Sequence, residues 1–179
     1  MTEKKLERII CEKAMIDLTT GRPGVSREDG DLRYVIAYKP SEDAEDPEAT
    51  TVKLYLFWTD DHSLMVRYAA EHCDDEFAKD AIARCERYEP KWDEPVLGGG
   101  FARRSHDGRR VRLFGRSGGT GAVPEDLVKK CLEGSSFDFE KNRFEPEYTV
   151  ECPPMRLFDP DIRKYEGAKK WLKRMGFDS

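Results

Sequence analysis

Residues 51–62 read Thr-Val-Lys-Leu-Tyr-Leu-Phe-Trp-Thr-Asp-Asp-His, an apolar run that ends in two aspartates and a histidine. The part from Val52 to Trp58 is rich in β-branched and aromatic residues and has the length of a typical strand, and the run from Tyr34 to Tyr38 shares both properties. The acidic residues 41–48 (SEDAEDPE) lie between the two runs, lack an apolar period and indicate a solvated loop. We therefore predict two strands joined by this loop, with His62 just beyond the second strand.

The chain after this histidine has the spacing of a helix. From Ser63 to Arg87, apolar residues recur mostly at steps of three or four positions, with an interruption expected at Asp74–Asp75. The glycines at 98–100 are predicted to end the next element. A hairpin from Phe101 to Phe114 should follow, because Asp107-Gly108 is a two-residue turn signal.

The last third of the chain contains two further helix signals and one strand signal. Pro124 followed by two acids predicts a helix over Glu125–Leu132 that stops at Gly134, because proline and carboxylates both suit the first turn. Residues 146–152 alternate and predict a strand that ends at two prolines. Residues 159–161 (DPD) then indicate a helix start. The C-terminal helix is predicted to be amphipathic and to pack on the domain or bind a partner, with an apolar face of Ile162, Tyr165, Ala168, Leu172 and Met175.

Length and composition limit the protein classes. The 179 residues include 31 Lys and Arg against 36 Asp and Glu, a net charge of −5, and 38% are hydrophobic, enough for the core of one domain. The apolar runs are far shorter than the roughly 18 residues of a membrane span. The N-terminus carries too much charge for a signal peptide, so we expect an intracellular, cytoplasmic protein without membrane association.

The cysteines and histidines do not form a recognisable metal motif. The five cysteines (Cys11, Cys73, Cys85, Cys131 and Cys152) contain no C-x-x-C pair, which argues against a disulfide framework and a zinc cluster. The three histidines (His62, His72 and His106) fall in no metal-binding pattern. The sequence therefore favours chemistry without a metal or another cofactor.

A glycine-rich segment at Gly115–Gly121 (GRSGGTG) is a candidate anion site. Consecutive peptide N–H groups in such a turn can form an anion-binding nest, Ser117 and Thr120 add hydroxyl donors, and arginines are frequent nearby. On composition alone, an ordinary connecting turn is an equal alternative. The segment lacks the Gly-Lys-Ser/Thr of a P-loop. Its G-x-S-x-G match does not fit an α/β-hydrolase, because no histidine follows His106.

His62 lies where a strand is predicted to end and a helix to begin. Rigid scaffolds often present catalytic groups at such positions, and a helix N-terminus can help to hold an anion. A surface or capping histidine beside two aspartates is the alternative interpretation, and we keep it for His72 and His106.

Four motifs, taken in order, resemble those of the phosphohistidine phosphatase (Janus) family. They are Gly30–Ile36 (GDLRYVI), Trp58–His62 (WxxxH), Leu97–Gly100 (LGGG) and Val111–Gly121 (VxLFGxSxxxG). The resemblance covers about residues 14–152. It implies a single compact α+β domain with a mixed β-sheet flanked by two helices over 1–152, and activity without a metal. Residues 153–179 lie outside the resemblance, and their own helix signals predict a helical extension.

The same resemblance assigns candidate site residues. His62 matches the active-site histidine, and Arg33 stands where the family usually has a catalytic-site lysine. The candidate phosphate-binding residues are Ser117, Gly118, Gly119 and Thr120 of the turn, with Arg103 and Arg116. In two departures from the family, Phe101 replaces the arginine after the triple glycine and Leu54 replaces an arginine in the strand before the histidine.

The resulting hypothesis is a metal-independent phosphatase that acts on phosphohistidine, or phospholysine, in a protein substrate. Neutral His62 would attack the phosphoryl group or take a proton from the attacking water, and the sequence leaves both open. One alternative is a phosphate-recognising regulatory module that has lost catalysis through Phe101 and Leu54. A nucleic-acid-binding protein is a weaker alternative, because the net charge of −5 opposes it despite the arginines of 103–116.

Overall fold

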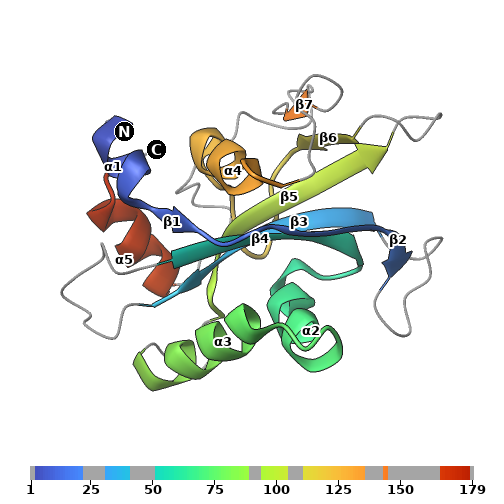
Figure 1. Cartoon of the computed structure of the whole chain (residues 1–179), viewed down its shortest axis with the longest axis horizontal. Helices are drawn as coiled ribbons and strands as arrows, with labels where there is room; N and C mark the ends of the chain where they lie inside the picture. The colour runs from blue at the N-terminus through green and yellow to red at the C-terminus, as the bar shows by residue number, and fades with distance from the viewer. Residues whose placement is uncertain are drawn as a thin grey trace.

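The computed structural model describes residues 3–21, 31–40, 51–88, 94–104, 111–135, 143–144 and 166–177. These residues form one α+β domain with helices on both faces of a mixed sheet (Figure 1). Within them, seven strands form a single sheet in the order β1-β4-β3-β5-β6-β7, and β2 also pairs with β4. The strands are β1 (Ile10–Cys11), β2 (Met15–Gly21), β3 (Asp31–Lys39), β4 (Thr51–Thr59), β5 (Val96–Arg104), β6 (Val111–Phe114) and β7 (Arg143–Phe144). The helices are α1 (Glu3–Arg8), the 3-10 helix η2 (His62–Leu64), α2 (Met65–His72), α3 (Glu76–Tyr88), α4 (Glu125–Leu132) and α5 (Glu166–Arg174).

The two predicted strands form the centre of this sheet. β3 and β4 pair antiparallel along their whole length, from Asp31 opposite Thr59 to Lys39 opposite Thr51. β5 pairs antiparallel with the other edge of β3 and then with β6, whereas β1 and β2 run parallel to β4. Because the apolar runs occupy central strands, side chains such as Ile36 are fully buried.

Alternation of side chains along β3 determines what each sheet face contacts. Odd-numbered residues face α2 and α3: Lys39 lies 5.2 Å from the centre of the Phe77 ring and forms an ion pair with Asp80. Even-numbered residues face α4 and α5, and the Tyr38 ring is 6.4 Å from that of Trp171 on α5. The C-terminal helix thus packs on the domain, as the sequence predicted, and its buried Ala168 and Leu172 belong to the same core.

The prediction that the triple glycine ends an element is wrong. Gly98–Gly100 lies inside β5, where the three glycines pair with β3. A Cβ atom on Gly99 would lie 2.3 Å from the carbonyl oxygen of Tyr34, and one on Gly100 would lie 2.6 Å from that of Phe114. The glycines therefore allow neighbouring backbones to approach closely, a reason that local sequence does not reveal.

The helix predictions agree with the structure in most details. The run from 63 to 87 divides into α2 and α3 at the expected interruption, where Asp74 adopts a positive φ of 52°. Helix α4 spans the predicted residues and is followed by Gly134 with φ 73°. The predicted loop at 41–48, turn at 107–108, strand at 146–152 and helix start at 159–161 lie outside the described residues.

The strands at the sheet edges were not predicted from the sequence. β1 and β7 are two residues long, and β2 has a shift of register against β4. In the part of the chain that the structure describes, no helix combines the length and the apolar character that a bilayer span requires.

Candidate functional site

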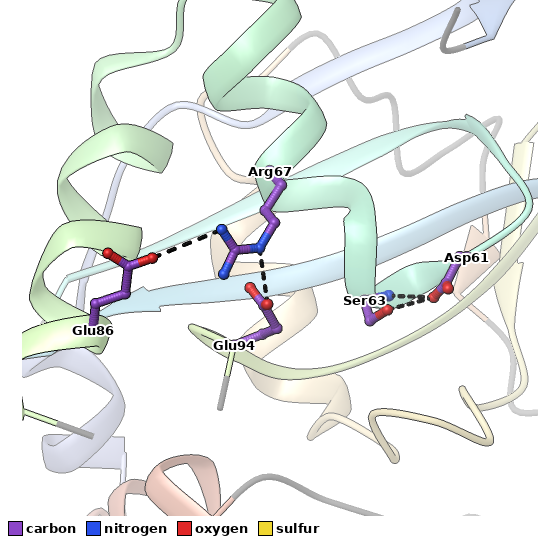
Figure 2. Close-up of polar contacts among 5 residues, drawn as sticks. All are labelled: Asp61, Ser63, Arg67, Glu86 and Glu94. Carbon is purple, nitrogen blue, oxygen red and sulfur yellow. Dashed lines mark hydrogen bonds and ion pairs between the residues drawn. The ribbon is translucent and has the colours of Figure 1, made fainter. Parts of the chain in front are cut away.

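His62 lies at the end of β4, at the first position of η2. The carboxylate of Asp61 caps this short helix, accepting hydrogen bonds from the backbone N–H of Ser63 at 2.8 Å and from its hydroxyl at 2.6 Å (Figure 2). The cap turns the next side chain inward, and His62 is only 4% exposed. The predicted position between strand and helix is confirmed, but the residue is buried rather than on the surface.

A second set of contacts holds α2, the helix that follows His62. Arg67 of α2 donates from Nε to Glu94 at 2.9 Å, just before β5, and its Nη1 lies 3.9 Å from a carboxylate oxygen of Glu86 on α3 (Figure 2). One guanidinium thus links α2 to α3 and to the start of β5. These contacts fix the helix that follows His62 to α3 and to the segment before β5.

The contacts of the His62 ring define its tautomer. Nδ1 lies 3.1 Å from Nη1 of Arg33, and Nε2 lies 2.6 Å from the carbonyl oxygen of Gly100. A guanidinium only donates and a carbonyl only accepts, so Nδ1 accepts and Nε2 carries the proton. The structure therefore holds a neutral imidazole with its one lone pair directed at Arg33.

Phe101 forms a wall of this site. The sheet register places Phe101 directly opposite Arg33. Its ring meets the His62 ring edge to face, with centres 5.1 Å apart and planes at 88°, and Cζ of Arg33 lies 5.0 Å from the centre of the Phe101 ring. An aromatic ring therefore stands where the resemblance implies an arginine, and it orients both Arg33 and His62 by packing.

The glycine-rich segment forms a compact turn joined to β5. Ser117 N–H donates to the Gly99 carbonyl and Gly99 N–H donates to the Gly121 carbonyl, both at 2.9 Å. Inside the turn, Gly121 N–H donates to Ser117 O at 2.9 Å and Thr120 N–H donates to Ser117 Oγ at 3.0 Å. Ser117 thus shapes the turn from a buried position.

The two amides at the tip of this turn remain available to a ligand. Gly118 and Gly119 are exposed, and among the described residues neither N–H donates to an acceptor. Thr120, the next residue, is buried. Two adjacent open amides can donate hydrogen bonds to an anion, and the anion-binding nest stays a prediction.

Gly99 brings the turn and the histidine together. Both of its backbone polar groups bond to the turn, and a Cβ atom on it would lie 3.1 Å from Cδ2 of His62. Arg33, His62 and the turn of Ser117, Gly118, Gly119 and Thr120 therefore share one region. Arg116 precedes the turn and is half-buried.

Two residues singled out from the sequence lie away from this region. Arg103 is exposed and stacks on Phe114, with Cζ 5.0 Å from the ring centre. Leu54 is fully buried opposite Ile36, on the face toward α4 and α5, whereas Arg33 and His62 lie on the face toward α2. A change from arginine to leucine at position 54 therefore removes no group from the His62 region.

The chemistry of the site favours an anion. A guanidinium, a neutral imidazole and two open amides are donors or nitrogen ligands, and none of them carries negative charge. Among the described residues, no three His, Cys, Asp or Glu side chains are grouped as metal ligands. Comparison of the chain with protein-family models, with curated proteins and with solved structures gave no match.

Proposed function

We propose that this chain is a phosphatase that hydrolyses phosphohistidine in proteins, with His62 as the reacting residue. The observation that carries the proposal is the contact of Arg33 with Nδ1 of neutral His62, together with the turn of Gly118 and Gly119, which is hydrogen-bonded to Gly99 beside the same ring. A cation at the nitrogen lone pair and open amides on the adjoining turn suit the binding of a phosphoryl group.

Binding of the phosphoryl group would release the lone pair of the histidine. The non-bridging oxygens would accept hydrogen bonds from the Arg33 guanidinium and from the turn amides, so Arg33 would cease to donate to Nδ1. The free lone pair would then face phosphorus. The carbonyl of Gly100 would keep the Nε2 proton in place and stabilise the positive charge that develops on the ring.

This arrangement allows two reaction routes. In the nucleophilic route, the P–N bond of the substrate breaks as a P–Nδ1 bond forms, and water then releases inorganic phosphate from His62. In the general-base route, Nδ1 takes a proton from water while the water oxygen attacks phosphorus, and the P–N bond breaks as His62 returns this proton to the departing substrate imidazole. Only the nucleophilic route places phosphate on His62, which mass spectrometry of base-quenched protein would detect.

The experiment measures hydrolysis of phosphohistidine, phospholysine and aryl phosphate substrates in the presence of EDTA. His62→Ala should abolish turnover, and His72→Ala, which removes an exposed histidine of α2, should retain it. Turnover that survives His62→Ala would overturn the assignment. The ranking of the three substrates would define the bond that the enzyme cleaves.

A second candidate is a phosphate-recognising module of the same site without turnover. The observation that favours it is the burial of His62, which is 4% exposed with both ring nitrogens hydrogen-bonded. Such a module would bind phosphopeptides through Arg33 and the turn and would leave them intact. Phosphopeptide binding measured by calorimetry, with no turnover in the hydrolysis experiment, would identify it.

A further inference from the structure

A row of stacked arginines and phenylalanines leads from the His62 site to the surface of the β5–β6 hairpin. Arg33 stacks on Phe101, and the Phe101 ring centre is 6.1 Å from that of Phe114, with planes at 28°. Two guanidinium groups cover Phe114, with Cζ of Arg103 at 5.0 Å and Cζ of Arg112 at 6.0 Å from its ring centre. We call these five residues the arginine–phenylalanine row.

The outer end of the row faces solvent. Along β6, Val111 and Leu113 are buried, whereas Arg112 is exposed and Phe114 is half-buried. The register of the hairpin places Arg103 opposite Arg112 and Phe101 opposite Phe114, so these four residues share one face. Arg103 is also exposed. The row therefore ends in an accessible pair of arginines.

Such a pair is suited to an anionic partner. Like charges directly opposite each other on a sheet face repel. Both guanidinium groups lie over the Phe114 ring at the exposed end of the row, and a guanidinium binds a carboxylate in a bidentate manner along its edge. The pair is a local positive feature in a chain whose net charge is −5.

We propose that Arg103 and Arg112 bind acidic side chains that flank the phosphorylated residue of the substrate protein. This inference rests on the proposed function, since it takes the phosphorylated side chain to lie at His62. Arg103 is two residues along β5 from Phe101, which is roughly 7 Å, and an extended peptide covers a similar length in two residues. Acidic residues two to four positions from the phosphorylated residue fit this spacing.

The same face suits an acidic peptide better than a nucleic acid. Binding of single-stranded nucleic acid relies on base stacking against open aromatic faces. Both phenylalanines here are half-buried and already stacked on each other and on arginines. The contact offered to a partner is therefore the guanidinium edge.

The test compares two phosphohistidine peptides that differ only in flanking Asp or Asn residues. We expect the wild type to show a kcat/KM about fivefold higher for the acidic peptide at low salt, in keeping with two exposed ion pairs. The double variant Arg103→Gln, Arg112→Gln should lose this preference. Arg87→Gln, which removes an exposed arginine at the end of α3, should keep it. Equal preference in the wild type and the double variant would overturn the proposal.

A binding measurement separates this inference from the proposed function. Fluorescence anisotropy of a labelled, unphosphorylated acidic peptide should give an affinity about fivefold weaker for the double variant, whether or not any peptide is hydrolysed. Unchanged affinity would overturn the docking proposal alone. Tighter binding of a single-stranded RNA of equal charge, lost in the same variant, would overturn it in favour of a nucleic-acid partner.

An independent observation concerns two cysteines that are distant in sequence. Sγ of Cys131 in α4 lies 3.7 Å from Sγ of Cys11 in β1, and the two residues are 120 positions apart. Cys11 is half-buried, whereas Cys131 is almost fully buried. The hydrogen bond from Cys131 lowers the pKa of the Cys11 thiol, and the same bond together with burial raises that of Cys131. The more accessible sulfur is thus also the more readily ionised one.

We infer that a hydroperoxide converts this pair into a disulfide. The Cys11 thiolate would attack the peroxide oxygen, which forms a sulfenic acid and releases water or an alcohol. Cys131 would then attack the sulfenic sulfur, and the second oxygen would leave as water. The sulfur atoms must approach from 3.7 Å to the bonded distance of about 2.05 Å, which is a local movement. The bond would tie the first strand to the helix that follows the Ser117 turn.

The test treats the full chain with hydrogen peroxide and maps disulfides by mass spectrometry without reduction. We expect a Cys11–Cys131 linked peptide and a higher thermal midpoint, because a cross-link across a long loop restricts the unfolded chain. Cys11→Ser should abolish both effects, and Cys73→Ser, which removes an exposed thiol, should leave them. Oxidation of Cys73 with Cys11 and Cys131 still reduced would overturn the inference.

Discussion

Two polar clusters lie on the face of the sheet toward α2 and α3, one near each end of β4. Near the start of β4, the Asp75 carboxylate accepts hydrogen bonds from Lys53 at 2.7 Å, from the Tyr55 hydroxyl at 2.6 Å and from the Ala78 N–H at 3.0 Å. Beyond the end of β4, Arg33 donates to His62, and His62 donates to the Gly100 carbonyl. We call these the aspartate cluster and the histidine cluster.

The clusters differ in how charge is balanced within them. In the aspartate cluster a carboxylate faces an ammonium, and both are largely buried, at 9% and 13% exposure. In the histidine cluster the acceptors are a neutral nitrogen and a peptide carbonyl, so the contact itself does not neutralise the guanidinium. The first arrangement stabilises the junction of α2, α3 and β4, and the second favours the binding of an anion.

The largest effect should come from the glycine that supports the histidine cluster. Gly99→Ala places a Cβ atom 2.3 Å from the Tyr34 carbonyl oxygen, which the pairing of β3 with β5 does not allow. We expect a loss of about 4 kcal/mol in the free energy of unfolding, measured by urea denaturation. The control is Gly118→Ala in the exposed turn, where a Cβ atom meets nothing within 4 Å. Equal stability of the two variants would contradict the packing role of Gly99.

A smaller but still large effect should come from the aspartate cluster. Asp75→Asn removes the charge opposite Lys53, which stays largely buried, so the free energy of unfolding should fall by about 3 kcal/mol. Asp126→Asn, at an exposed position of α4, should change it by less than about 0.5 kcal/mol. Phosphate binding at the histidine cluster should be unaffected. A joint loss of stability and phosphate binding would contradict the separation of the two clusters.

Acid should weaken the aspartate cluster in a predictable direction. Burial raises the pKa of Asp75, but hydrogen bonds from Lys53, Tyr55 and the Ala78 N–H outweigh burial and hold the pKa below its usual value. The contribution of Asp75 to stability is therefore complete above the ordinary carboxyl range and is lost as the pH falls through the folded pKa. Urea midpoints from pH 7 to pH 3 should fall more steeply for the wild type than for Asp75→Asn. The same dependence of the urea midpoint on pH in both proteins would contradict this contribution of Asp75 to stability.

The smallest change in stability should come from the histidine cluster itself. Arg33→Met keeps an apolar contact with Phe101 and removes the hydrogen bond to His62, so stability should change by less than about 1 kcal/mol. Affinity for inorganic phosphate, measured by calorimetry, should fall about tenfold. Arg33→Lys should retain part of the affinity for phosphate. A large loss of stability would assign Arg33 to the scaffold instead.

The central part of the fold could be predicted from the sequence because its signals are local. The apolar runs of β3 and β4, the three- and four-residue spacing in α2 and α3, and the proline before α4 each determine their own element. The short strands at the sheet edges depend on pairing with β4 and β6 and have little signal of their own. The glycines of β5 were predicted to end an element because the sequence does not show how closely the neighbouring strands approach them.

The candidate site was only partly predictable. His62 and the turn at Ser117 could be found from their motifs, and the structure brings both to Gly99. The tautomer of His62 and the stacking of Arg103 on Phe114 depend on strand register. The contact between Cys11 and Cys131 joins residues 120 positions apart, so no sequence spacing could have indicated it.

The bonding of Gly99 also determines which parts of the site can move. Its N–H and the N–H of Ser117 are hydrogen-bonded between β5 and the turn, so their hydrogens exchange with solvent only when the sheet itself opens. The amides of Gly118 and Gly119, without such bonds among the described residues, exchange as in an open peptide. The turn is therefore held in place by hydrogen bonds while two of its amides stay solvated. The rate of ligand binding is then determined by diffusion of the ligand to the turn and not by the closing of a loop.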